Sequence, residues 1–340
     1  MISLFIIYIT LIAFIPYIKI YLLLFIEYSI IPILFLDKGI SYLFNRKYIV
    51  KAKNNIFDYK GYVIGITGSG GKTSTKYYLS QALSLYYNVS FTPKSYNTPL
   101  GISYHINNIN IDSIDYLILE FGVSTIGDMK RLKDIVPPNV AFITDIGYMH
   151  MDGFGSIEEI VKEKLSILDG TYKAVVNYDV DLIRDNIDYN GILITYGFDH
   201  GDYKAVNIHD GSFDVEYKNE YIGSFKTKLV GKYQILNMLG VIAYIHSEGL
   251  DLNILKRGIV MFKGVSNRLE IRNINNATII DDSYNSNFEG FSNALDVLSS
   301  FSWVAVIATV SISSNNCKNN SFVSNSIHSD GTPINLIVLS

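Results

Sequence analysis

The sequence predicts an α/β protein in which a central, mostly parallel sheet carries a phosphate-binding loop. Residues Tyr62–Thr67 form a short β-branched apolar run, Gly68–Ser74 are rich in glycine, and a helical stretch follows to Leu85. Two more apolar runs, Tyr116–Glu120 and Val140–Thr144, have the composition of strands buried on both faces of a parallel sheet. This order of strand, glycine loop and helix, followed by further buried strands, is typical of nucleotide-binding proteins.

The composition limits the class of protein further. Hydrophobic residues make up 49% of the 340 residues and charged residues 18%, which is too apolar for a disordered chain and too polar for a wholly membrane-embedded one. The net charge of −4 argues against a nucleic-acid partner, because such proteins carry a basic footprint. The single cysteine, Cys317, excludes a disulfide framework and any CxxC site.

The N-terminal segment is strongly apolar. Met1–Leu36 contains only two charged residues, Lys19 and Glu27. The uncharged run Met1–Ile18 has about the length that crosses ~30 Å of hydrocarbon, and a second apolar run contains Glu27 near its middle. A cleaved signal peptide would need a basic start and a small-residue cleavage site, and neither is present. The sequence thus predicts a transmembrane helix or hairpin, with a buried soluble helix as the alternative.

Basic residues follow the apolar segment directly, namely Lys38, Arg46, Lys47, Lys51 and Lys53. Cytoplasmic flanks of membrane helices carry an excess of Lys and Arg. We therefore expect residues 1–37 to be a membrane segment and residues 38–60 a basic linker. The expected location is the cell membrane, with the catalytic body on the cytoplasmic side.

The glycine loop has the residues that bind nucleotide phosphates. Glycines let backbone N–H groups approach phosphate oxygens, and the helix N-terminus adds partial positive charge. Lys72 and Thr73 can address the terminal phosphates and Mg²⁺. The strict pattern has a glycine where Ile66 stands, so this loop is a shortened variant. A chance glycine turn is the alternative, but the flanking strand and helix favour phosphate binding by Gly68, Ser69, Gly70, Gly71, Lys72, Thr73 and Ser74.

Polar residues follow the other predicted strands at their carboxyl ends, where doubly wound proteins bind ligands. Glu120 ends one strand, and Asp145 and His150 follow another. Ser156 is placed to cap the next helix, which carries Lys164. A carboxylate and an imidazole beside a phosphate loop suggest a divalent-cation site.

Several motifs occur in a fixed order from about residue 61 to 297. They are GITGSGGKTSTK at 65–76, SYNTPLG at 95–101, LEFGVS at 119–124, a stretch from Ile143 to Ser156, GKYQILN at 231–237, NRLE at 267–270 and DDSYNSN at 281–287. This series resembles the Mur ligases, the ATP-dependent amide-forming enzymes of peptidoglycan precursor synthesis. It is most similar to the branch that adds D-alanyl-D-alanine to a UDP-muramoyl-tripeptide.

The resemblance implies an acid–amino-acid ligase that uses ATP and Mg²⁺ and forms an acyl phosphate. It implies that Lys72 contacts the ATP phosphates and that Thr73 and Glu120 bind one Mg²⁺. His150 and a carbamoylated Lys164 would bind a second Mg²⁺, because a carbamate offers the anionic oxygens that Mg²⁺ prefers. The implied catalytic residues are Lys72, His150 and Lys164.

The same resemblance implies further binding residues and partners. Asn237, Arg268 and Asp282 would contact ATP, and Asn97 and Thr98 the substrate. The implied partners are a peptidoglycan precursor peptide and an amino acid or dipeptide. Three alternatives remain: a ligase of another amino-acid polymer, a homologue that binds ATP without completing ligation, and an unrelated P-loop NTPase, which would need a DxxG motif that we do not find in convincing context.

The sequence also departs from the family pattern. The family's His-Asn pair is replaced by Tyr233-Gln234, and its Asn-Pro pair by Asn287-Phe288. The membrane segment stands where the family has its uridine-nucleotide domain. We expect a central ATP-binding domain over residues 61–262, followed over 263–340 by an incomplete Rossmann-like C-terminal domain with one further strand, Trp303–Val310, and a polar tail.

Overall fold

The computed structural model describes residue 41 and residues 43–149, 151–209, 211–266, 268–274 and 277–281. Within these ranges the chain forms a nine-stranded sheet in the order β2-β3-β1-β4-β5-β6-β7-β8-β9, and a separate two-stranded sheet of β10 and β11. The expected membrane segment over residues 1–37, the strand expected at Trp303–Val310 and the polar tail lie outside the described residues.

The large sheet consists of β1 (Tyr62–Thr67), β2 (Val89–Phe91), β3 (Tyr116–Glu120), β4 (Val140–Ile143), β5 (Lys173–Asn177), β6 (Ile192–Gly197), β7 (Tyr203–His209), β8 (Ser212–Tyr217) and β9 (Glu220–Lys226). The small sheet pairs β10 (Glu270–Ile274) with β11 (Ala277–Asp281) in antiparallel register. The labelled helices are α2 (Lys72–Leu83), α3 (Pro99–Asn107), α4 (Asp128–Lys133), α5 (Met151–Phe154), α6 (Ile157–Leu165), α7 (Asp181–Arg184), α8 (Lys232–Ser247) and α9 (Leu252–Ile259). Single 3₁₀ turns cover Ile111–Ser113 and Ser166–Leu168.

The strands from β2 to β6 run parallel, with β1 between β3 and β4. The sequence predicted the bounds of β1 and β3 correctly, and β4 ends one residue earlier than expected. Because the chain leaves β1 between two parallel neighbours, the loop after it opens at the carboxyl edge of the sheet, where ligands bind in such folds.

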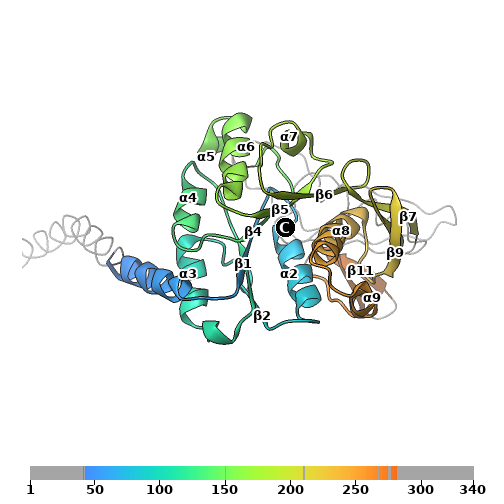
Figure 1. The fold of residues 1–340 in the computed structure, drawn as a ribbon, viewed down its shortest axis with the longest axis horizontal. Coiled ribbons are helices and arrows are strands. Elements are labelled where there is room, and N and C mark those ends of the chain that lie inside the picture. The colour runs from blue at the N-terminus through green and yellow to red at the C-terminus, as the bar shows by residue number, and fades with distance from the viewer. Residues whose placement is uncertain are drawn as a thin grey trace, which may run out of the picture.

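Two hydrophobic clusters cover the two faces of the sheet. Alternate residues of each central strand point to opposite faces, so Val63 joins one cluster while its neighbour Ile64 joins the other. Helices α3, α4 and α6 cover one face, and α2, α8 and α9 cover the other (Figure 1). Burial on both faces explains why these strands read as nearly continuous apolar runs.

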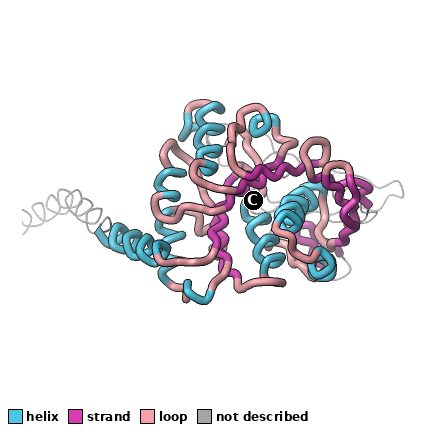
Figure 2. Tube along the Cα trace, viewed as in Figure 1, coloured by secondary structure: helices cyan, strands magenta, loops and turns pink. Residues whose placement is uncertain are grey.

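The far end of the sheet is antiparallel. β7, β8 and β9 form an antiparallel meander joined to the edge of the parallel part, and the tube in Figure 2 shows its strands turning away from the parallel strands. The burial pattern of β7 alternates along most of the strand, as expected for strands with one solvated face. The sheet is therefore mixed but mostly parallel, which confirms the prediction, and the antiparallel part was not predicted.

Residues 43–57, which lie in the stretch expected to be a basic linker, form a helix packed on α3. Asn55 donates from Nδ2 to Asn107 Oδ1 at 3.1 Å, and Asn107 donates to the carbonyl of Tyr48 at 2.9 Å. The rings of Tyr48 and Tyr104 stack, and Ala52 is fully buried. In the described part of the chain, no helix combines the length and the apolar character that crossing a bilayer needs.

Candidate active site

The loop between β1 and α2 forms the centre of the site. Gly71, the residue before α2, has φ 77°, a left-handed conformation that glycine adopts without strain. Lys72 lies at the first position of α2 and its Nζ donates to the carbonyls of Gly68 at 2.7 Å and Ser69 at 3.2 Å. The predicted strand, loop and helix are thus confirmed, and the Lys72 side chain folds back to bind two carbonyls of the loop.

The end of β4 holds this loop from the other side. The Gly70 amide donates to Asp145 Oδ2 at 3.0 Å, and the Thr144 hydroxyl donates to the carbonyl of Gly70. Ser69 accepts at Oγ from the Gly147 amide at 2.8 Å. Burial raises the pKa of Asp145, an effect that the Gly70 hydrogen bond and nearby lysines oppose. The segment after β4, which the sequence placed near the ligand, therefore fixes the shape of the phosphate loop.

Glu120, at the end of β3, collects three hydrogen-bond donors. Its Oε2 accepts from Thr73 Oγ1 at 3.0 Å and from Lys76 Nζ at 3.0 Å, and its Oε1 accepts from Asn97 Nδ2 at 3.1 Å. Burial by itself would raise the pKa of Glu120, but the Lys76 ammonium and then Lys72 hold the pKa below its usual value. The carboxylate is ionised and lies beside a threonine hydroxyl, a donor set that suits Mg²⁺.

Lys76 was not predicted as a site residue, although it follows Lys72 by one helical turn and so shares its helix face. Its side chain is 1% exposed and forms a buried ion pair with Glu120, and it also donates to the carbonyl of Lys94 at 2.6 Å. Burial lowers the pKa of Lys76, and the Glu120 carboxylate opposes that shift. The ion pair stabilises the negative charge that the site needs.

Lys164 lies on α6, whose first turn is capped as predicted: Ser156 Oγ accepts from the Glu159 amide at 3.3 Å. Lys164 is 1% exposed, and no described carboxylate lies within 4.0 Å of its Nζ. Burial, followed by the charge of Lys72, lowers the pKa of Lys164 to about 7, while Asp145 opposes the shift. His150 lies outside the described residues.

Two residues from the end of the central region reach the same loop. Thr75, on α2, donates to Asn237 Oδ1 at 3.2 Å, and the buried Asn237 Nδ2 has no hydrogen-bond partner among the described residues. Arg268 donates from Nη2 to Thr73 Oγ1 at 3.2 Å. The structure thus brings Asn237 and Arg268 to the phosphate loop, and their contact with a nucleotide stays a prediction. Asp282 lies outside the described residues.

The Tyr233-Gln234 pair also meets the loop. A Cβ added to Gly70 would lie 2.5 Å from the Tyr233 hydroxyl. With Tyr233 in this position, only glycine fits at residue 70 without a shift of the tyrosine side chain. Gln234 accepts from the Tyr78 hydroxyl at 2.7 Å and donates to the carbonyl of Arg268 at 3.3 Å. Gln234 therefore joins α8 to α2 and to the segment that carries Arg268, a role that no local sequence signal indicated.

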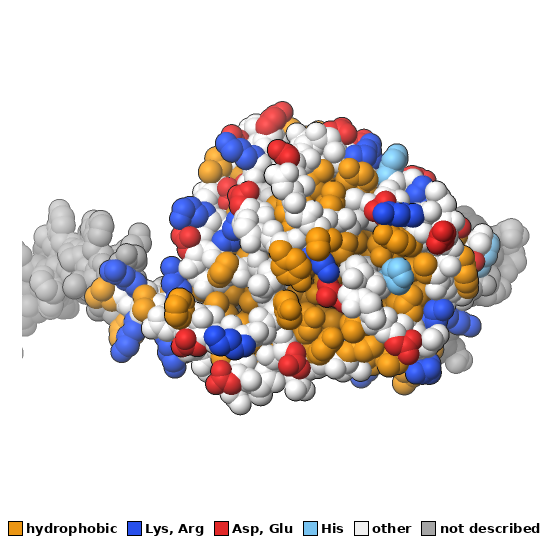
Figure 3. Space-filling view, in the orientation of Figure 1, with side chains coloured by type: hydrophobic (Ala, Val, Ile, Leu, Met, Phe, Trp, Pro, Cys, Tyr) orange, Lys and Arg blue, Asp and Glu red, His pale blue; other side chains and the backbone are white. Residues whose placement is uncertain are grey.

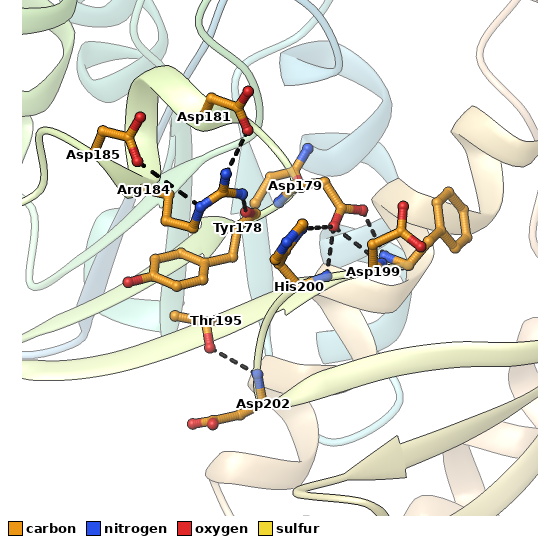
Figure 4. A network of polar contacts seen from close by, with 11 residues as sticks. Tyr178, Asp179, Asp181, Arg184, Asp185, Thr195, Asp199, His200 and Asp202 are labelled. Atoms are coloured by element: carbon orange, nitrogen blue, oxygen red, sulfur yellow. Dashed lines mark hydrogen bonds and ion pairs between the residues drawn. The ribbon is translucent and has the colours of Figure 1, made fainter.

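A network of polar contacts joins the end of β5 to the loop after β6 (Figure 4). Asp179 accepts from the amides of Phe198, Asp199 and His200, at 3.1 Å for Asp199 and 2.8 Å for His200. Two residues before it, the buried Asn177 donates to the carbonyl of Thr144 at 3.1 Å. The end of β5 is thus tied both to the next loop and to the residue that holds Gly70.

The remaining predicted residues have structural partners. Thr98 caps α3 by accepting from the Gly101 amide at 3.2 Å, and Ser74 is buried in the first turn of α2. Asn97 lies at Glu120, as described above. Among the described residues, no group of three or more His, Cys, Asp or Glu gathers as a metal site. The predicted metal residues Glu120 and Thr73 are hydrogen-bonded to each other.

Comparisons with known proteins agree with this geometry. The family model of the Mur ligase middle domain matches residues 66–245. The UDP-N-acetylmuramoyl-tripeptide–D-alanyl-D-alanine ligase of Borreliella burgdorferi is 30% identical over 67% of this chain and 50% of its own length. The ligase of the same name from Escherichia coli is 28% identical over 69% of this chain and 54% of its own length.

A solved structure supports the same relationship. The crystal structure of MurF ligase from Thermotoga maritima in complex with ADP superposes with a TM-score of 0.68 and 27% identity, covering 75% of this chain and 61% of that one. The present chain spans about half the length of the curated relatives it matches. Since the family model covers more than half of the chain and the phosphate loop, Glu120 and Lys164 all lie within the matched residues, the chain belongs to the Mur ligase family.

Proposed function

We propose that this chain is an ATP-dependent ligase that forms an amide bond on a peptidoglycan peptide precursor, with D-alanyl-D-alanine or an amino acid as the amine. The observation that carries the proposal is the arrangement around the loop. An ionised Glu120 lies beside Thr73 on one side, and a buried Lys164, whose pKa is about 7, lies within the field of Lys72 on the other. The names of the relatives supply the proposed substrates.

The proposed reaction has two steps. A carboxylate oxygen of the precursor attacks the γ-phosphorus of ATP, and the bond to the bridging oxygen breaks to release ADP. The amine nitrogen then attacks the acyl carbon, the phosphate departs with the electron pair, and the nitrogen loses a proton. Phosphoryl transfer depends mostly on positioning and neutralisation of charge. Lys72 supplies one such charge, and hydrogen bonds of the Gly70 amide and of the Lys72 ammonium fix the shape of the loop.

In the proposed site, Thr73 and Glu120 hold a Mg²⁺ ion, which neutralises phosphate charge when bound. Glu120 fits this role because the Lys76 ammonium keeps its pKa low and Asn97 orients its second oxygen. We expect Glu120→Gln to raise the Mg²⁺ concentration needed for half-maximal turnover, while Asp112→Asn, a change on a surface turn, leaves it unaltered.

Lys164 is proposed to carry a carbamate. Only the neutral amine attacks CO₂, and the pKa of about 7 leaves roughly half of Lys164 neutral at pH 7. The amine gains a C–N bond and loses a proton, so a buried cation becomes an anion that can face Mg²⁺. Carbamoylation thereby replaces the repulsion between the two ammonium groups of Lys164 and Lys72 with an attraction.

The reaction is tested with the full chain by isotope exchange between ATP and ADP. We expect exchange that requires a UDP-muramoyl-tripeptide but no amine, and amide formation once D-alanyl-D-alanine is added. Exchange without amide would indicate a homologue that stops at the acyl phosphate. Absence of both, in a protein that binds ATP, would contradict the proposal.

The carbamate has its own test. We expect Lys164→Ala to lose activity and to regain part of it with added short carboxylates, which can occupy the vacated space. Lys162→Ala, on the exposed side of the same helix, is the matched control and should neither lose activity nor respond. Equal activity of the Lys164→Ala protein and its parent would exclude the role.

The proposed ligase is attached to the cell membrane through residues 1–37, with the catalytic body on the cytoplasmic side. The apolar composition of those residues and the basic residues after them support this. We expect the full chain to stay with the membrane fraction after alkaline carbonate washing. Release of the protein by carbonate would contradict an inserted segment.

A further inference from the structure

The helix over residues 43–57 carries an apolar strip on its exposed side. Leu43, Val50 and Phe57 are spaced seven residues apart, so they lie along one side of the helix. They are 64%, 47% and 87% exposed. Large apolar side chains that line up on one surface mark an interaction site more often than scattered ones do.

Basic side chains flank this strip on both sides. At 100° per residue, Lys47 and Lys51 fall on one flank and Arg46 and Lys53 on the other, and all four are exposed. Residues 43–57 contain no Asp or Glu. Figure 3 shows the helix projecting from the body with basic and hydrophobic side chains next to one another. The exposed side is therefore apolar in its middle and positively charged along both edges.

The opposite side of the helix is already used. Ala52 is fully buried, and Asn55 and Tyr48 contact Asn107 on α3, as described above. The helix is thus fixed to the body through the side opposite the strip. Because the helix is fastened to the body, whatever binds the strip also sets the orientation of the catalytic domain (Figure 1).

We propose that the helix over residues 43–57 lies in the plane of an anionic lipid surface. The strip of Leu43, Val50 and Phe57 would enter the boundary between headgroups and acyl chains, and the four cations would lie among anionic headgroups. Long basic side chains suit this position because their stems cover apolar surface while their charges stay in water. This inference goes beyond amide formation and concerns how the body meets the membrane.

The charge pattern matches a lipid surface, because an anionic bilayer supplies negative charge along both edges of the strip, where the basic residues lie. The apolar run of residues 1–36 also brings the chain to a membrane just before this helix, although that support rests on the proposed attachment. Four charges in 15 residues exclude a spanning helix for this segment.

An environment-sensitive dye tests the proposal in the full chain. With Cys317→Ser, a single cysteine is introduced as Val50→Cys and labelled, and the control carries Tyr221→Cys on β9, an exposed position far along the sequence. The vesicles contain phosphatidylcholine with or without phosphatidylglycerol. We expect a blue shift and quenching by spin-labelled lipid at position 50 with anionic vesicles, and neither at position 221. Both proteins retain residues 1–40, so any contribution of that segment is the same.

A pair of charge reversals tests the electrostatic part. We expect Lys47→Glu with Lys51→Glu to reduce the ratio of docked to undocked helix about tenfold or more, since each basic residue near an anionic surface contributes several-fold. Lys226→Glu with Lys228→Glu, exposed on and after β9, is the charge-matched control and should change nothing.

Three results would overturn the proposal. First, the dye at position 50 could stay in water with both kinds of vesicle. Second, its emission could shift equally with neutral and anionic vesicles and be unchanged by the charge reversal. It could also shift without vesicles as protein concentration rises, which would assign the strip to a second copy of the chain. None of these measurements involves ATP or ligation. A negative result would therefore contradict the membrane-docking proposal without contradicting the proposed reaction.

Discussion

The two sides of the phosphate loop each bury a lysine, and the two lysines differ in their surroundings. On the β3 side, Lys76 is 1% exposed and forms an ion pair with Glu120 at 3.0 Å. On the α6 side, Lys164 is also 1% exposed but has no carboxylate within 4.0 Å among the described residues. Burial lowers the pKa of both lysines, to about 7 for Lys164.

The difference shows how one side chain type can serve two purposes. Lys76 keeps Glu120 ionised, so its charge is a permanent part of the site. Among the described residues, Lys164 has only Asp145 to offset its burial and its repulsion by Lys72, so its neutral form is accessible near pH 7. A buried lysine with an anionic partner stays an ammonium and acts as a counter-ion, whereas one without a close partner loses its proton more easily and becomes a neutral amine.

The largest expected effect is at Lys72, whose charge acts on both sides by lowering the pKa of Glu120 and that of Lys164. We expect Lys72→Ala to reduce ATP turnover by roughly 10²–10³-fold or more, because a fixed charge on the transferred phosphate is lost. Phosphate release is the measurement, and thermal unfolding checks that the fold persists. Turnover of ATP at the parent rate would contradict a role of Lys72 in binding the phosphates.

The ion pair on the β3 side is tested by Lys76→Met, which leaves Glu120 buried without its counter-ion. We expect the free energy of unfolding to fall by about 3–5 kcal/mol, as for other buried pairs that lose one partner. Urea unfolding measures this loss. The double variant Lys76→Met with Glu120→Gln should recover part of it. A loss as small as that of an exposed lysine would show that the pair does not stabilise the fold.

The α6 side is tested by the pH dependence of stability. The pKa of Lys164 is about 7 in the folded protein and about 10.4 in the unfolded chain, so between these values only the unfolded state holds the proton. Stability therefore rises with pH in this window, by up to about 1.4 kcal/mol per pH unit. We expect the parent to gain stability relative to Lys164→Met between pH 7 and 9, by about 2–3 kcal/mol at most.

The measurement is urea unfolding of both proteins in parallel, so that other titrating groups cancel. Carbamoylation would be minimised by degassed buffers, since a carbamate removes the amine that titrates. Parallel pH profiles of the two proteins would mean that Lys164 keeps an ordinary pKa, and the contrast between the two lysines would disappear.

The smallest expected effect concerns how α6 is held. Glu163, next to Lys164, accepts from the amides of Gly127 at 3.0 Å and Met129 at 2.7 Å, at the start of α4. We expect Glu163→Gln to cost about 1 kcal/mol, because charge-assisted bonds at a helix N-terminus are weakened. Glu220→Gln, exposed at the start of β9, is the control and should leave stability unchanged. If both variants unfold alike, Glu163 does not secure α6.

Much of the fold was predictable because its signals are local. Tyr62–Thr67 and Tyr116–Glu120 were recognised as strands because burial on both faces makes a strand apolar throughout. The antiparallel strands β7–β9 were not recognised, since their alternating pattern is weak and β7 and β8 contain bulges in their pairing. The helix over residues 43–57 was missed because four basic residues interrupt its apolar pattern and only Ala52 is fully buried.

The candidate site was predictable in part for the same reason. The glycine loop and Glu120 carry local signatures, whereas Lys76 and Gln234 act through residues far away in the sequence. Tyr233 departs from the family pattern, and only the packed structure shows its hydroxyl against Gly70. The assignments of His150 and Asp282 stay predictions, because both residues lie outside the described chain.

Short runs of neighbouring residues were enough to recognise the phosphate loop, the parallel strands that position it and the family to which the chain belongs. Which lysine has an anionic partner depends instead on the packing of distant segments. Lys76 and Lys164 look alike in the sequence, and burial together with neighbours from β3, β4 and α2 separates them. A side chain's charge state depends on every group within reach in space, and chain order does not specify those groups.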